Sequence, residues 1–127
     1  MADVATLTAL TPREAVADAL YRCLIGIDSN NIDLFESACL QTEDMTVVAG
    51  PIDIKGWTAI REFFQRVFTL MTTHITSNIR IELENGGNTA SMTAHAIAYH
   101  IRPEDALKRE DTSYTGSCLY HLDLVKN

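Results

Sequence analysis

Residues 73–101, THITSNIRIELENGGNTASMTAHAIAYHI, contain two long runs of β-forming residues on either side of a turn. The runs cover residues 73–83 and 89–101 and are rich in Ile, Thr and alternating small residues, which favours strands. Asn85-Gly86-Gly87-Asn88 stands between them and is typical of a tight turn. The segment therefore predicts an antiparallel pair of strands, which at this length must be strongly twisted, bent or bulged.

A third long strand is expected after this pair. Residues 112–125 again favour a strand, and a loop around residues 103–111 connects it to the one before. The chain stops at Asn127 without a turn and a return strand. We expect that a final C-terminal strand of the sheet lies outside this sequence.

The segment before residue 73 predicts helices and one short hairpin. Residues 45–55 alternate like two short strands broken at Gly50-Pro51, and residues 57–71 carry the wide apolar stripe of a helix. Thr11-Pro12-Arg13-Glu14 combines an N-cap, a proline at the first helical position and a capping-box glutamate. A helix from there to about Asp28, with apolar residues at three- and four-residue spacing, and a short helix over residues 32–39 are predicted.

Helices followed by antiparallel strands indicate the α+β class, with the helices gathered on one face of a curved sheet. Such a sheet forms a cone-shaped barrel with one open end. Small residues along the second long strand would leave room inside for a ligand: Ala90, Ala94, Ala96 and Ala98. The 127 residues, 46% of them hydrophobic, suffice for one core, so we expect a single domain over residues 1–127.

Composition argues against several functions. The net charge is −7 and the ten Lys and Arg residues are scattered, which disfavours nucleic-acid binding. No apolar run approaches the roughly 20 residues of a membrane span, and residues 1–10 lack the pattern of a signal peptide, so a cytoplasmic protein is expected. Three cysteines without metal-ligand spacing predict neither a disulfide framework nor a metal site, and no sequence motif calls for a cofactor.

Two segments carry a family resemblance: Leu20-Tyr21-Arg22-Cys23-Leu24-Ile25-Gly26-Ile27-Asp28 and Thr73-His74-Ile75-Thr76-Ser77-Asn78-Ile79-Arg80-Ile81-Glu82. With the order of elements, they resemble the SnoaL-like branch of the NTF2-like superfamily, relatives of scytalone dehydratase and hexachlorocyclohexane dehydrochlorinase. Residues 93–100 also resemble fungal members of this group. The resemblance implies an Asp at the end of the first helix that orients a catalytic His, roles that fall on Asp28 and His74. The dehydrochlorinase has a lysine in its first helix, and the matching position in this chain is Cys23, which is not basic. This difference disfavours dehydrochlorination itself.

The residues themselves support this pair. An imidazole exchanges protons near neutral pH, and a carboxylate that accepts one ring N–H fixes its tautomer and stabilises its protonated form. Asp28 shares a helix face with Tyr21 and Leu24 and would point toward the cavity mouth. The alternative is that Asp28 only begins the turn Asp-Ser-Asn-Asn and His74 is an ordinary polar strand residue.

Other pocket residues are expected around this pair. His95 and His100 are five apart and would face opposite sides of a regular strand, and we predict that His95 is the second pocket histidine because His100 lies near the strand end. Tyr21 is the expected hydrogen-bond donor. The expected apolar walls are Leu24, Trp57, Phe64 and Met92.

Together these features predict a cofactor-independent lyase, isomerase or cyclase that acts by acid–base chemistry on a hydrophobic, oxygenated small molecule, polyketide- or terpenoid-like. The alternative is a non-catalytic small-molecule-binding or dimerisation module. In either case we expect a homo-oligomer, a dimer or trimer, because barrels of this resemblance usually associate through the outer sheet face.

Overall fold

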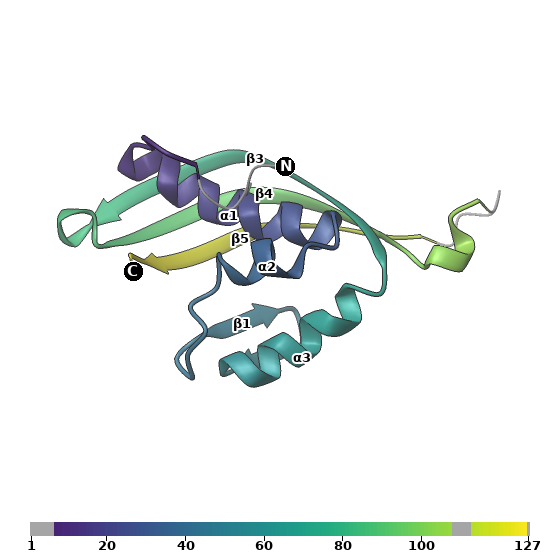
Figure 1. The fold of residues 1–127 in the computed structure, drawn as a ribbon. Helices are drawn as coiled ribbons and strands as arrows, with labels where there is room; N and C mark the ends of the chain where they lie inside the picture. Colours follow the sequence, from purple (N-terminus) through teal and green to yellow (C-terminus); the bar gives the residue numbers. More distant parts are fainter. Residues whose placement is uncertain (1–6, 108–112, 127) are drawn as a thin grey trace.

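A computed structural model of the protein describes residues 7–107 and 113–126. Two helices, a hairpin and a third helix come before three long strands, and the helices lie on one side of the curved sheet (Figure 1). The elements are α1 (Pro12–Asp28), α2 (Ile32–Glu36), β1 (Thr46–Ala49), β2 (Ile52–Lys55), α3 (Trp57–Val67), β3 (Met71–Glu84), η1 (Asn85–Gly87), β4 (Thr89–Ile101), η2 (Pro103–Asp105) and β5 (Tyr114–Val125).

The main sheet has the strand order β3-β4-β5 and is antiparallel throughout. A β-bulge interrupts β3 between Ser77 and Arg80, where Asn78 takes a positive φ of 53°. Two residues of β3 oppose one of β4 there, so the alternation of side chains changes phase. Before the bulge the even-numbered residues of β3 face the helices, and after it the odd-numbered residues do.

The side of the sheet that the helices cover is called the concave face here. Helix α1 lies across it. Its start is fixed as the sequence predicts, by a reciprocal capping box between Thr11 and Glu14. The apolar face of α1 packs on side chains from three strands, namely the part of β3 after the bulge, β4 and β5. This cluster comprises Val16, Leu20, Leu24, Ile79, Ile81, Met92, Ala94, Tyr120, Leu122 and Leu124.

A second core cluster joins α1 to α2 and α3. Phe35 is its centre, with its ring centroid 4.8 Å from that of Phe64 and 6.4 Å from that of Trp57. Gly26 allows this arrangement, since a Cβ there would lie 2.5 Å from the backbone nitrogen of Phe35. The two helices are therefore in backbone contact at this point.

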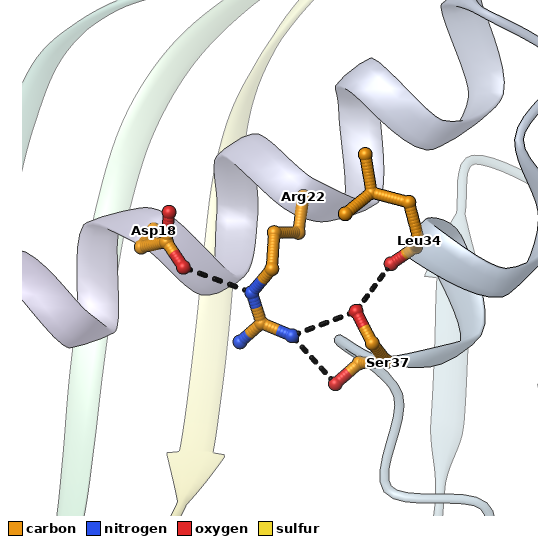
Figure 2. Close-up of polar contacts among 4 residues, drawn as sticks. All are labelled: Asp18, Arg22, Leu34 and Ser37. Carbon is orange, nitrogen blue, oxygen red and sulfur yellow. Dashed lines mark hydrogen bonds and ion pairs between the residues drawn. The ribbon is translucent and has the colours of Figure 1, made fainter. Parts of the chain in front are cut away.

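A polar clamp also holds α2 against α1 (Figure 2). The Arg22 guanidinium donates to the Asp18 carboxylate at 2.9 Å, to the backbone carbonyl of Ser37 at 2.7 Å and to the Ser37 hydroxyl at 2.8 Å. The same hydroxyl donates to the Leu34 carbonyl at 2.6 Å. Charge-assisted bonds of this kind are stronger than neutral ones, so the clamp stabilises the contact between α1 and the end of α2.

The α+β class with helices packed on a curved antiparallel sheet is confirmed, and the described strands do not close into a complete barrel. Several boundaries differ from the expected ones. The second helix ends at Glu36 instead of near Cys39. The third helix, which was expected to reach Met71, ends at Val67, and β3 begins at Met71 instead of Thr73. The predicted start of the last strand at Thr112 lies outside the described residues.

Candidate functional site

Asp28 and His74 meet where the end of α1 reaches the first half of β3. The His74 ring nitrogen Nδ1 lies 2.7 Å from Asp28 Oδ1, and the His74 backbone N–H donates to Asp28 Oδ2 at 2.8 Å. The Thr72 hydroxyl donates to Oδ1, also at 2.8 Å. The structure thus joins Asp28 and His74 through two hydrogen bonds, and Thr72 supplies a third to the same carboxylate.

This geometry determines which ring nitrogen is free. A carboxylate can only accept, so with Asp28 ionised the proton of a neutral His74 sits on Nδ1 and the lone pair on Nε2. The His74 side chain is 7% exposed and that of Asp28 24%, which shields the pair from bulk water. An Asp at a helix C-terminus opposes the helix dipole at a cost of about 0.3–1 kcal/mol, and here three donors compensate for it.

The prediction that His95 is the second pocket histidine is wrong. Strand β4 is regular, so His95 lies on the opposite, convex face, where Nδ1 is 3.0 Å from the Asn78 amide nitrogen. His100 instead lies beside His74, with ring centroids 5.7 Å apart and planes at 85°. The signal was present in the sequence, because Ala90, Ala94, Ala96 and Ala98 were expected to face inward and His100 continues their alternation.

The expected walls do not form one pocket. Leu24 and Met92 are buried in the cluster under α1, whereas Trp57 and Phe64 pack on Phe35. His74 pairs with Ala98, six residues along β4 from Met92, a separation of about 20 Å at roughly 3.4 Å per residue. Met92 therefore cannot contact a molecule held by His74. Tyr21 is 41% exposed on α1.

Three titratable side chains in the two core clusters favour their neutral forms. Burial is the main cause that raises the pKa of Cys23, Cys39 and Tyr120 to about 12 each. The two thiols are therefore poor nucleophiles at neutral pH, and the Tyr120 phenol keeps its proton. Within residues 7–107 and 113–126 no group of His, Cys, Asp or Glu side chains is arranged to hold a metal ion. In the same ranges no helix is long and apolar enough to cross a membrane.

His100 gives the first prediction, which concerns pH. Burial, and next the charge of a protonated His74, lower its pKa below the ordinary 6.5, while the Tyr114 backbone and Asp28 act in the opposite direction. The unfolded chain then binds more protons than the folded chain as the pH falls from 6.5 through the lowered pKa, so stability is lost over that range. Urea unfolding should show this decline, and His100→Gln should flatten it. Equal slopes for the two proteins would contradict the assignment.

The chain is similar in sequence to known proteins. A family described as "SnoaL-like domain" matches residues 8–127. A relative from Penicillium crustosum, "Terrestric acid biosynthesis cluster protein E", is 30% identical over 125 residues, 98% of this chain and 78% of the relative.

Solved structures share the fold. The chain resembles a putative scytalone dehydratase from Novosphingobium aromaticivorans with a TM-score of 0.74 and 20% identity, over 91% of this chain and 74% of that one. It also resembles a hexachlorocyclohexane dehydrochlorinase, LinA type 2, with a TM-score of 0.59 and 17% identity, over 89% and 88% of the two chains. At these identities the structural likeness concerns the fold alone.

Proposed function

Because the chain belongs to the SnoaL-like domain family, we propose that it is a cofactor-independent lyase, isomerase or cyclase acting on a hydrophobic, oxygenated small molecule of secondary metabolism, polyketide- or terpenoid-like. The observation that carries the proposal is the 2.7 Å contact between His74 Nδ1 and Asp28 Oδ1. It leaves Nε2 as a base whose protonated form a carboxylate stabilises. The name of the Penicillium crustosum relative supports the metabolic setting.

In the proposed reaction Nε2 of His74 removes a proton from a carbon next to a carbonyl group. The electron pair of the broken C–H bond moves into the carbonyl group and forms an enolate. Asp28 stabilises the imidazolium through the Nδ1–H bond. In an elimination the enolate re-forms the carbonyl group, a C=C bond forms, the C–O bond to the leaving oxygen breaks and His74 protonates that oxygen. In an isomerisation the enolate instead takes the proton from His74 at another carbon. General acid–base steps of this kind contribute typically about 10²–10⁴-fold each.

The test uses 5-nitrobenzisoxazole, a probe that needs only a base. Removal of its C3 proton breaks the ring N–O bond and releases a coloured phenolate, so turnover is followed by absorbance. We expect the wild-type protein to accelerate this elimination. A wild-type rate no higher than that of free imidazole at equal concentration would count against the enzyme proposal and favour a binding module.

A homo-oligomer is the second part of the proposal, and the convex face of the sheet supports it. Three large apolar side chains lie exposed there on three neighbouring strands, Ile75, Ile97 and Leu119. They border a shallow hollow of about 480 Å³. Contiguous exposed apolar surface of this kind commonly marks an interface between proteins.

The oligomer prediction is tested by light scattering at micromolar concentration. We expect a dimer or trimer, and Ile97→Lys should shift the mass toward the monomer because it places a charge in the interface. Ile25→Lys, the same change at an exposed position of α1, serves as the control and should keep the wild-type mass. A monomeric wild-type protein would remove this part of the proposal.

The cellular setting is the last part. Cys23, Cys39 and Cys118 are all free thiols. Free cysteines fit a reducing compartment, which supports our proposal that the protein is cytoplasmic.

A further inference from the structure

A tyrosine of the edge strand lies beside the two histidines of the concave face. The Tyr114 ring is 6.0 Å from that of His100, which in turn is 5.7 Å from that of His74. Tyr114 is 70% exposed, and among residues 7–107 and 113–126 no side chain or backbone group bonds its hydroxyl. The phenol is therefore a free donor at this end of the sheet.

The phenol leans toward His74 along a row of very small residues. His74 pairs with Ala98, and Ala98 pairs with Gly116, so the three residues form a row across the concave face of the sheet. A Cβ on Gly116 would lie 3.5 Å from Tyr114 Cε1 and 3.6 Å from its hydroxyl oxygen. The hydroxyl thus sits over the glycine, and only the Ala98 methyl group stands between it and His74 in this row.

The spacing of the row suits a small planar molecule. Two neighbouring strand spacings of about 4.8 Å separate His74 from Gly116, so their backbones are about 10 Å apart. A carbon about 3 Å from the imidazole and a carbonyl oxygen about 3 Å from the phenol fit between them, since catalytic contacts of this kind are roughly 2.6–3.5 Å long.

Resting on the proposed function, we propose that Tyr114 donates its hydroxyl hydrogen bond to the carbonyl oxygen of an enolisable substrate that lies on Ala98 and Gly116. As His74 removes the proton from the adjacent carbon, negative charge develops on that oxygen and the bond strengthens. The substrate class is then a flat, neutral ketone or ester, because the row offers an aromatic donor and small apolar residues. One buried ring nitrogen, His100 Nδ1, has no hydrogen-bond partner among the described residues, and its ring lies next to that of Tyr114.

The test combines one variant with a matched control. Tyr114→Phe removes only the hydroxyl, and Tyr99→Phe removes the hydroxyl of an exposed tyrosine on the convex face of the neighbouring strand. In the 5-nitrobenzisoxazole assay we expect Tyr114→Phe to lower kcat roughly 10- to 100-fold with little change in KM, as for a donor whose hydrogen bond strengthens in the transition state. Tyr99→Phe should match the wild type.

A binding measurement accompanies the kinetics. The wild-type protein should bind 4-nitrophenolate with a shifted absorption maximum, and Tyr114→Phe should lose the shift and weaken binding by a similar factor. If Tyr114→Phe matches the wild type within twofold while His74→Ala is inactive, the assignment of Tyr114 is wrong and the proposed base stands. If no variant changes the probe rate, the proposed function fails, and equal phenolate binding by wild type and Tyr114→Phe then overturns the present inference as well.

Discussion

His74→Ala should lose at least about 100-fold in turnover of 5-nitrobenzisoxazole, because it removes the base, and general-base catalysis is typically worth about 10²–10⁴-fold. Added imidazole should restore part of the rate, since the truncated side chain leaves space next to Asp28. Asp28→Asn should lower the rate by a comparable order, because the amide cannot stabilise the imidazolium and favours the wrong tautomer. Initial rates as a function of pH check both expectations.

The free energy of unfolding distinguishes Asp28→Asn from His74→Ala. Asp28 also accepts hydrogen bonds from the Thr72 hydroxyl and the His74 backbone N–H, so Asp28→Asn should lower the free energy of unfolding by about 1–3 kcal/mol. His121→Ala removes an exposed histidine from the convex face and is the matched control, expected to keep both the rate and the stability. A His74→Ala protein that retains wild-type turnover would show that the contact with Asp28 is only structural.

Gly26→Ala should destabilise the fold by about 1–3 kcal/mol, the usual cost of forcing an extra methyl group into a packed site. The new Cβ would lie 2.5 Å from the Phe35 nitrogen and 2.8 Å from the Phe35 Cα, both backbone atoms, so α2 must move away from α1. Alanine gains about 0.5–1 kcal/mol over glycine inside a helix, which offsets only part of this cost. Urea unfolding measures the difference.

Ile25→Ala is the control for this variant, because it changes an exposed neighbour on the same helix. It should shift stability by no more than about 0.5 kcal/mol, as surface changes usually do. A Gly26→Ala protein as stable as the wild type would mean that α2 is free to shift without loss. In that case the backbone contact would not be required for packing.

The sequence was sufficient for the helix start at Thr11, the strand of residues 89–101 and the placement of Asp28 near His74. Each of these rests on a local pattern, a capping box or a period of two, or on the family resemblance. His100 was missed because nearness to a strand end was given more weight than alternation. The bulge in β3 was anticipated only as a possibility, and the register change at Ser77 depends on a backbone conformation at Asn78 that no local pattern fixes.

The walls of the site were the least predictable part. Leu24, Trp57, Phe64 and Met92 are all large and apolar, which identifies core residues but not the cluster to which each belongs. That choice depends on how far apart the residues lie along the strands and helices after folding. Tyr114 illustrates the same limit, because its place over Gly116 arises from the pairing of three strands.

The bulge at Asn78 lets a single strand serve two different environments. Its first half presents Thr72 and His74 to Asp28, and its second half presents Ile79 and Ile81 to the side chains under α1. The bulge, where the alternation of side chains shifts, lies between the two halves of β3. The half that carries Thr72 and His74 can therefore vary in sequence without disturbing the register of the apolar half that carries Ile79 and Ile81. The chemistry of this chain could therefore diversify by substitutions at one end of β3 while the other end continues to hold the fold.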